Sequence, residues 1–217
     1  MSSTNHDVHT MYEEAVNHPT YGEEWRRAIQ SELESMDKNH AWDMVKPPSG
    51  VNIVDSKWIF AIKRDANNEI VRFKARLVAR GFSQAYGVDF WDTFAPVAKL
   101  TTYRLIFALA TLEQWELHGV DITTAFLLGE LEEDIYMALP PGYRWGKGLV
   151  CKLKKSIYGL KQAAHIWNRK LHDFLVKLGF NQLKADPFLY VYQGRPFYLT
   201  IWVDDILIAG PKPTEIA

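Results

Sequence analysis

Only one cysteine, Cys151, occurs among the 217 residues. A single cysteine excludes an internal disulfide and any zinc site built from several cysteines, and it is typical of a protein in a reducing compartment. No run of about eighteen apolar residues is present, so the sequence predicts no membrane-spanning helix. The N-terminus, Met1 to His9, also lacks the apolar stretch of a secretory signal. We therefore expect no membrane partner.

Net charge is also small, at −1, but the charges are unevenly distributed. Residues 56–104 carry nine Lys or Arg against four Asp or Glu, and residues 144–177 carry nine against one. Between these blocks, residues 112–136 carry seven acids and no Lys or Arg. One such block alone is typical of a solvated surface. The basic–acidic–basic order favours a protein that binds an anionic polymer on its basic parts and gathers cations at its acidic part.

Three helices are predicted from apolar residues that recur at helical spacing. The first begins at Thr20, which has capping-box spacing to Glu23, and it ends near Asn39. The second begins at Thr101 or Thr102. The apolar stripe of the third comprises Trp167, Leu171, Phe174 and Leu178. Residues 1–19 are polar and are predicted to form a flexible N-terminal segment.

Strands are predicted over residues 57–63, 70–80, 116–120, 188–192, 197–203 and 206–209. Turn-forming residues at 65–68 and 193–196 join neighbouring strands, which favours hairpins. Hairpins mixed with helices predict an α+β fold, with an antiparallel sheet and packed helices.

The strand predicted over residues 70–80 has one apolar and one cationic face. The apolar face comprises Val71, Phe73, Ala75, Leu77 and Ala79, and the cationic face comprises Arg72, Lys74, Arg76 and Arg80. Residues on one face of a strand repeat about every 7 Å, so these cations would roughly match successive phosphates of a nucleic acid. Each cation taken alone is also explained by simple surface exposure.

Two adjacent carboxylates, Asp204 and Asp205, stand between two short apolar runs that are typical of strands. Because buried unpaired charges are unfavourable, we expect the pair at the tip of a hairpin. Asp121 ends another apolar strand, and three carboxylates on neighbouring strands would suit two divalent cations bridged by substrate phosphates. Two simpler interpretations stay open. Asp-Asp is a common turn dipeptide, and Asp121 alone is explained as a helix cap or loop residue.

An ordered series of motifs, covering about residues 25–210, resembles the reverse transcriptase of copia-type LTR retrotransposons. The motifs are Lys57–Phe60, Lys74–Gln84, Asp92–Val97, Asp121–Gly129, Leu131–Met137, Leu153–Gln162 and Val203–Asp205. The resemblance implies a right-hand polymerase fold, with a fingers hairpin at about 57–80 and a palm at about 100–217. The implied activity is RNA-directed DNA polymerisation, in which a nucleotidyl group passes from a dNTP to a primer 3′-hydroxyl.

By the same resemblance, Asp121, Asp204 and Asp205 are the catalytic aspartates that bind two Mg²⁺ ions, with Mn²⁺ as an alternative. Asp121 and Asp204 are expected to bind both ions most directly, and Asp205 more weakly. Lys63 and Arg76 are the candidates for contacts with the triphosphate, because ammonium and guanidinium groups suit phosphate oxygens.

Further site residues also follow from the resemblance. Phe126 matches an aromatic ring that excludes a ribonucleotide 2′-hydroxyl, although a core phenylalanine explains it equally well. Gly159 and Gln162 belong to a segment beside the nascent base pair, in which Gly159 would let backbone approach a ligand closely. A strand-to-helix turn also explains that segment. The residues expected to contact the template and primer are Arg72, Lys74, Arg80 and Lys161.

The sequence departs from the family in places. Ala164-His165 stands where Pro-Arg is common, Trp202 stands where tyrosine is common, and the chain ends about twelve residues after Asp205. We therefore expect a C-terminally truncated palm. The RNase H and integrase parts of a Pol polyprotein are expected as partners but are absent from this sequence. The other expected partners are an RNA or DNA template with primer and a dNTP.

The resemblance implies an intracellular location, in the cytoplasm, in a virus-like particle or in the nucleus. Two other hypotheses stay open. The chain would be a truncated, inactive remnant that only binds nucleic acid, or a structural or interaction domain derived from such an element.

Overall fold

The computed structural model describes residues 6–8, 11–93, 99–143, 146 and 148–211, and within them it confirms an α+β fold. The chain divides into two compact units. Unit 1 comprises Met1–Asp92 and Phe126–Ala163, and unit 2 comprises Thr93–Ala125 and Ala164–Ala217. Residues 94–97 of one family motif, and the basic residues Arg144 and Lys147, lie outside the described residues.

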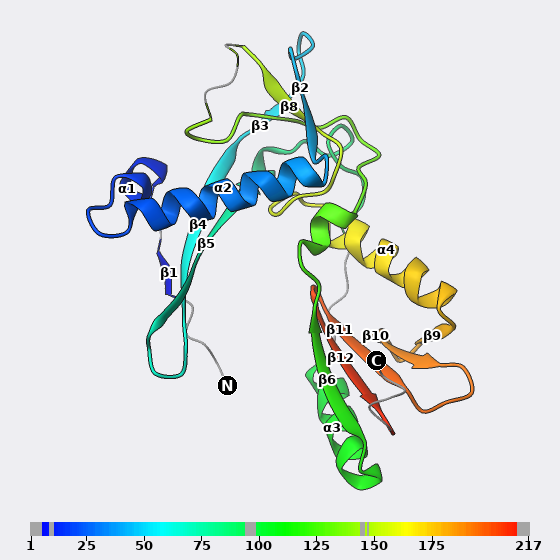
Figure 1. Ribbon diagram of the computed structural model, residues 1–217. Helices are drawn as coiled ribbons and strands as arrows, with labels where there is room; N and C mark the ends of the chain where they lie inside the picture. The colour runs from blue at the N-terminus through cyan, green and yellow to red at the C-terminus, as the bar shows by residue number, and fades with distance from the viewer. Residues whose placement is uncertain (1–5, 9–10, 94–98, 144–145, 147, 212–217) are drawn as a thin grey trace. The chain divides into compact units, whose positions relative to one another are not determined.

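Unit 1 contains the predicted cationic hairpin. Strands β4 (Ser56–Arg64) and β5 (Ile70–Ala79) pair antiparallel, and β1 (His6–Val8) pairs with the other edge of β4. Helix α2 (Gly22–Lys38) lies across this sheet (Figure 1). Trp25 of α2, Phe60 of β4 and Leu77 of β5 are buried in the resulting core. The alternation of apolar and charged residues therefore gives the hairpin one buried face.

The N-terminal part of unit 1 differs from the prediction in two details. The segment predicted to be flexible contains β1 and a short helix, α1 (Tyr12–Val16). The helix predicted after it is confirmed, but the capping box at Thr20 is wrong, because α2 begins at Gly22 with Tyr21 as its N-cap. The backbone N–H groups of Thr20 and Tyr21 instead donate to His18 Nδ1, at 3.2 and 3.0 Å.

A second sheet in unit 1 was not predicted. Its order is β2 (Trp42–Val45), β8 (Val150–Leu153), β7 (Tyr136–Met137) and β3 (Ile53–Val54). These strands are short and come from distant parts of the chain, so no local alternation of apolar and polar residues predicts them. A 3-10 helix, η1 (Gly81–Ser83), follows β5. Another, η2 (Ala125–Leu128), precedes β7.

Unit 2 is built on a five-stranded antiparallel sheet. Its order is β6 (Glu116–Asp121), β12 (Asp205–Gly210), β11 (Tyr198–Trp202), β10 (Asp186–Tyr192) and β9 (Phe180–Leu183). All of these strands except β9 were predicted. The β11–β12 hairpin lies inside the sheet, and its strand β12 pairs directly with the edge strand β6.

Helices α3 (Leu100–Glu113) and α4 (Ala163–Lys177) contact opposite faces of this sheet (Figure 1). Ile106 of α3 packs with Ala209, whereas Leu175 of α4 lines an apolar hollow with Ile206 and Ile208. The side chains of successive β12 residues therefore point alternately to the two faces of the sheet.

The predicted helix α3 is confirmed, but the predicted threonine cap is wrong. Its N-cap is Lys99, and the Thr102 hydroxyl donates to the carboxylate of Asp186 on β10. In α4, Trp167 and Leu171 are buried as predicted, whereas Phe174 is exposed and Leu175 continues the buried stripe.

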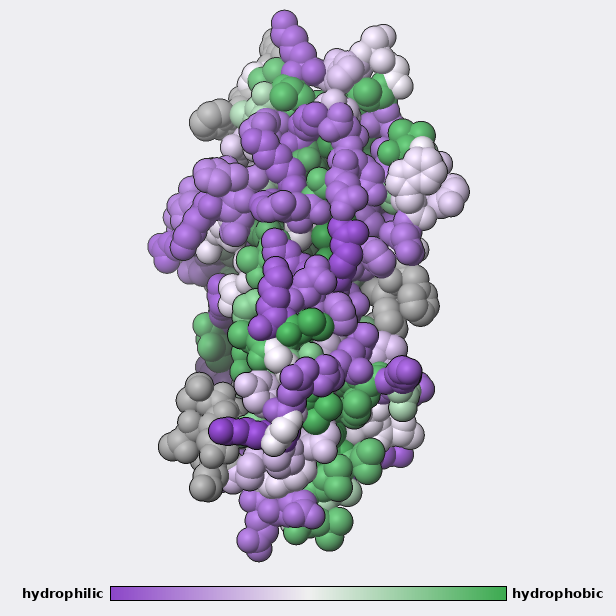
Figure 2. Space-filling model, turned by 90° about the vertical axis from the view of Figure 1, so that its right-hand side faces the viewer, coloured by the Kyte–Doolittle hydropathy of each residue, from purple (hydrophilic) through white to green (hydrophobic). Residues whose placement is uncertain are grey.

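Hydrophobic residues lie among hydrophilic ones on the face that Figure 2 shows. The exposed large hydrophobic residues of unit 2 include Leu105, Phe107 and Leu112 of α3. Within the described residues, no helix is both long enough and apolar enough to cross a bilayer.

Candidate functional site

The three candidate aspartates meet at one end of the unit 2 sheet. Asp121 and Asp205 are directly opposite each other in the β6–β12 pair. Directly opposed residues of antiparallel strands carry their side chains on the same face, with Cα atoms about 4.5–5.5 Å apart. Asp204 precedes Asp205 in the turn, and its backbone oxygen accepts a hydrogen bond of 2.8 Å from Ile122 N. Long-range strand pairing thus brings together carboxylates that are far apart in the sequence.

The turn that carries Asp204 has a strained backbone. Trp202 pairs with Asp205, so Val203 and Asp204 form the connection between β11 and β12. Val203 has a φ of 55°, a left-handed conformation that is rare for a β-branched residue and costs roughly 1–3 kcal/mol. Such strain is found preferentially at functional sites, where the surrounding structure enforces it.

Trp167 of α4 holds this turn in place. Its indole Nε1 donates a 2.6 Å hydrogen bond to the backbone oxygen of Val203. Trp167 is 5% exposed and Val203 is 37% exposed, so the hydrogen bond is partly buried. Sequence reasoning predicted Trp167 only as part of an apolar stripe and missed this role, because helical spacing carries no information about the indole N–H.

The aspartates fit a divalent cation in donor chemistry and in backbone placement. Asp121 and Asp205 are exposed and Asp204 is half-buried, and carboxylate oxygens are the ligands that Mg²⁺ prefers. In the part of the chain that the structure describes, no group of three or more His, Cys, Asp or Glu side chains is already arranged to hold a metal ion. Side-chain rotation would therefore have to complete such a site.

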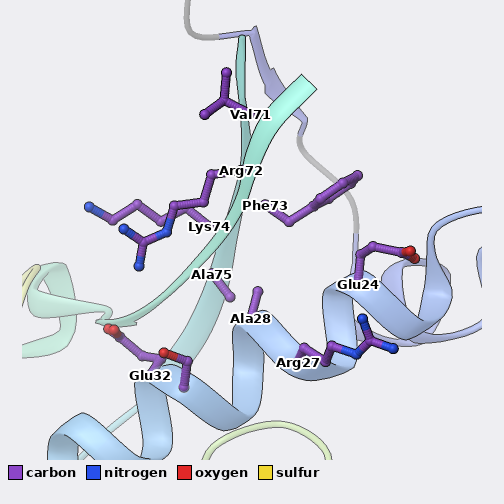
Figure 3. A pocket seen from close by; sticks show the side chains of 10 residues that line it. Glu24, Arg27, Ala28, Glu32, Val71, Arg72, Phe73, Lys74 and Ala75 are labelled. Carbon is purple, nitrogen blue, oxygen red and sulfur yellow. The ribbon is translucent and has the colours of Figure 1, made fainter. Parts of the chain in front are cut away.

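The cationic strand face of unit 1 has the predicted alternation. Arg72 and Lys74 extend from the same side of β5, whereas Phe73 points to the other side (Figure 3). Lys63 of β4 is directly opposite Arg72. Burial lowers the pKa of Lys74, and the neighbouring charges of Arg76, Lys63 and Arg72 lower it further. Four predicted cations are therefore close enough to repel one another, which favours an anionic ligand.

Glu32 of α2 lies beside these cations and was not predicted as a site residue. Its Oε1 accepts a 3.2 Å hydrogen bond from the backbone N–H of Leu77, at the edge of β5. Burial raises the pKa of Glu32, although the Leu77 N–H, Arg76 and Lys74 act in the opposite direction. With Lys74 it lines a pocket of about 310 Å³ between α2 and β5 (Figure 3). Polar residues are common along helices, so no signal in the sequence distinguishes Glu32 as a site residue.

Gly159 makes a close approach to protein backbone, and the approach to a ligand stays a prediction. Its φ is +88°, and a Cβ at this position would collide with the backbone oxygen of Ala79 and lie 2.6 Å from Val78 Cγ1. The adjacent Tyr158 oxygen accepts a 2.8 Å hydrogen bond from Ala79 N. The segment 158–162 is therefore fixed against the end of β5.

Tyr158 connects two predicted site residues. The Arg76 guanidinium carbon lies 5.2 Å from the centroid of the Tyr158 ring, and the Phe126 ring packs edge-on against it at 4.7 Å. Phe126 is half-buried and also packs against the core of unit 1. Tyr158 was not predicted as a site residue, because the neighbouring Gly159 favoured an interpretation in which this segment acts through its backbone.

Gln162 and Lys161 differ in exposure. Gln162 is 2% exposed; its Nε2 donates to Asp89 O at 2.7 Å, and its Oε1 accepts from Gln84 Nε2 at 3.0 Å. Lys161 and Arg80 are exposed; Lys161 Nζ donates to Gln84 O at 3.4 Å, and Arg80 lies 3.9 Å from the Asp55 carboxylate. The roles assigned to these residues from the sequence stay predictions.

The family model described as reverse transcriptase (RNA-dependent DNA polymerase) matches residues 39–217. The chain is 43% identical over 197 residues to the retrovirus-related Pol polyprotein from transposon RE1 of Arabidopsis thaliana, covering 88% of this chain and 13% of that protein. It is 42% identical over 191 residues to the corresponding polyprotein from transposon RE2, covering 86% and 13%.

A third relative comes from another plant. The chain is 40% identical over 209 residues to the retrovirus-related Pol polyprotein from transposon TNT 1-94 of Nicotiana tabacum, covering 94% of this chain and 16% of that protein. The chain thus spans less than a fifth of the length of these relatives.

Proposed function

This chain belongs to the reverse transcriptase (RNA-dependent DNA polymerase) family, and on that premise we propose that it carries the nucleotidyltransferase site of a copia-type Pol polyprotein. The proposed reaction transfers a nucleotidyl group from a dNTP to the 3′-hydroxyl of a primer paired with an RNA or DNA template. The observation that carries the proposal is the register of β6 against β12, which opposes Asp121 and Asp205 beside the turn that holds Asp204. The hairpin at about 57–80 would form the fingers, and residues from about 100 onward the palm.

Asp121, Asp204 and Asp205 would hold two Mg²⁺ ions, or Mn²⁺, in this proposal. When bound, the ions would lower the pKa of the attacking hydroxyl and neutralise charge on the leaving pyrophosphate. The protein itself supplies a rigid backbone for the carboxylates. The paired strands fix Asp121 and Asp205, and the hydrogen bond from Trp167 fixes the turn.

The cationic face of β5 would hold the negative charges of the substrates. Lys63 and Arg76 are proposed for the triphosphate, and Arg72, Lys74, Arg80 and Lys161 for the template and primer. Support comes from the mutual repulsion around Lys74, which an anion between these side chains would relieve. Phe126 would exclude a 2′-hydroxyl with a ring that Tyr158 supports from the side. Gly159 and Gln162 would act by fixing the segment 158–162.

Other parts of a Pol polyprotein, including RNase H and integrase, are proposed partners, because the relatives are Pol polyproteins and are several times longer than this chain. We propose an intracellular location on the same basis, either in the cytoplasm, in a virus-like particle or in the nucleus.

Primer extension with purified chain tests the proposal. The assay uses a 5′-labelled DNA primer on an RNA template, all four dNTPs and Mg²⁺, and it compares the unsubstituted chain with Asp121→Asn and Asp204→Asn. The matched control is Asp173→Asn, an exposed acid on α4 of the same unit. We expect extension by the unsubstituted chain and the control, and at least a hundredfold loss in both site variants, because removal of a single charge-stabilising group at an active site costs about that much.

Other outcomes separate the alternatives. Equal extension by Asp204→Asn and the unsubstituted chain would refute the site assignment. Salt-sensitive binding to the primer–template without extension would support the inactive remnant. Absence of salt-sensitive binding would favour the structural or interaction domain.

A further inference from the structure

The segment that follows β5 exposes large aromatic rings. Phe82 is 74% exposed, Tyr86 is 71% exposed and Trp91 is 63% exposed. Single exposed hydrophobic residues are ordinary, but three large aromatic rings within ten residues form a concentrated surface that indicates a partner. None of these residues belongs to the candidate site described above.

One of these rings, Tyr86, and one cation, Lys161, contact a buried ring, and Trp91 packs against Tyr86. Tyr86 packs edge-on against Phe90 at 5.6 Å and against Trp91 at 6.0 Å. The ammonium group of Lys161 lies 4.5 Å from the centroid of Phe90, which is only 9% exposed. Phe90 is thus the base of a platform whose accessible parts are Tyr86, Trp91 and Lys161.

The backbone beneath this platform is held by a network of hydrogen bonds. Asp89, which is 2% exposed, accepts from Asn52 Nδ2 at 2.6 Å and from Ala85 N at 2.7 Å. Asn52 Nδ2 also donates to the Ser83 oxygen at 2.9 Å. The platform is therefore fixed before any partner binds, which reduces the entropy that binding would lose.

A second aromatic–cation pair lies at the start of the same segment. The Arg80 guanidinium carbon is 5.0 Å from the centroid of the Phe82 ring. Arg80 also lies 3.9 Å from the carboxylate of Asp55, but both side chains are exposed, so this ion pair is weak enough to exchange for a phosphate.

We propose that Tyr86 and Trp91 are a stacking platform for unpaired bases of a single-stranded nucleic acid, with Lys161 and Arg80 as the neighbouring contacts to its phosphates. Flat exposed rings next to cations match a polymer that alternates flat bases with anionic phosphates. The inference rests on the proposed function, which requires a single-stranded template ahead of the primer.

Fluorescence anisotropy with labelled twelve-nucleotide oligo(dT) and oligo(U) tests the proposal, with a DNA duplex of equal length as the competing ligand. Stacking of one base contributes about 1–3 kcal/mol, so we expect Tyr86→Ala and Trp91→Ala to bind both oligonucleotides roughly 5- to 150-fold more weakly. Tyr86→Phe and Trp91→Phe keep a ring and should bind within about twofold of the unsubstituted chain. Val88→Ala is the matched control, because Val88 is 63% exposed in the same segment but cannot stack.

The salt dependence tests the cations separately. Lys161→Ala should reduce the slope of log Kd against log salt by about 0.7, because one phosphate contact to a single strand is lost. Circular dichroism melting of each variant identifies any that fail to fold. If an alanine variant does not fold, Tyr86→Leu or Trp91→Leu replaces it, because leucine keeps apolar bulk without a ring. The binding of that leucine variant is then compared with the binding of the phenylalanine variant at the same position.

The outcomes distinguish this inference from the proposed function. If the unsubstituted chain extends primers but the folded ring-less variants bind oligo(dT) and oligo(U) as tightly as Val88→Ala does, the platform is refuted and the polymerase proposal stands. If the unsubstituted chain binds neither primer–template nor single strands, both proposals fail. If ring removal changes only the self-association seen by analytical ultracentrifugation, the surface is a protein interface and the inference is wrong.

Discussion

Replacing Gly159 by alanine should destabilise unit 1 well beyond the usual effect of a glycine substitution. Two separate penalties act on the new methyl group. The backbone φ of +88° disfavours any L side chain, which costs about 1 kcal/mol. The added carbon would also collide with the backbone oxygen of Ala79, which a rigid strand holds in place.

Relief of that collision requires the segment 158–162 to move away from β5. The movement would break the 2.8 Å hydrogen bond from Ala79 N to the Tyr158 oxygen. Ala79 is 2% exposed, so its N–H would lose its partner away from water, at a cost of about 1–3 kcal/mol. Together the two penalties predict a loss of about 2–4 kcal/mol in the free energy of unfolding.

Urea denaturation followed by tryptophan fluorescence measures this loss. Gly50→Ala is a matched control in the same unit, because Gly50 has a φ of +78° but no atom within 4 Å of the added methyl group. The control should lose only the backbone penalty of about 1 kcal/mol. Equal losses in the two variants would refute the reasoning, because they would show that the close approach to β5 contributes nothing.

Three further substitutions have defined outcomes. Trp167→Phe removes the indole N–H that Val203 O accepts, so we expect about 1–3 kcal/mol less stability in urea, and in primer extension a lower kcat with little change in KM. Burial of Asp186 raises its pKa, but hydrogen bonds to its carboxylate outweigh this and leave the pKa below its usual value. The ionised carboxylate of Asp186 therefore stabilises unit 2 at pH values above its unfolded-state pKa of about 3.9. The difference in stability between the unsubstituted chain and Asp186→Asn should disappear as the pH falls through the folded-state pKa. Urea titrations of both proteins at pH 7 and pH 3 measure this difference. Tyr158→Ala should lose discrimination against ribonucleotides in extension assays more than Tyr158→Phe, which retains the ring beneath Arg76; identical discrimination by both would show that the ring has no such role.

The sequence predicted the elements whose pattern is local. The alternation along residues 70–80 gave both faces of β5, and the apolar runs around Asp204 gave the β11–β12 hairpin. The end of α4 also followed from a local signal, since Gly179 has a φ of +92° directly after the last helical turn. In each case, the residues that determine the structure lie within a few positions of it.

Features that depend on distant parts of the chain could not be predicted. The pairing of β6 with β12 in the register that opposes Asp121 and Asp205 is set by contacts across the whole of unit 2. The start of α3 was misplaced for the same reason. Thr102 would be a good cap by itself, but the carboxylate of Asp186 on β10 takes its hydroxyl. The motifs of the family identified which aspartates to consider, whereas strand pairing alone established that they are neighbours.

The left-handed backbone of Val203 has a consequence for anyone who engineers this protein. Asparagine and glycine adopt that conformation at less cost, so Val203→Asn or Val203→Gly is the obvious choice for a more heat-resistant chain. The same relaxation would free the turn to sample other shapes, and the neighbouring carboxylates would share that freedom. Under the proposed function, thermal stability and turnover would therefore be opposed at a single residue, and melting and primer-extension measurements on variants at position 203 would test this.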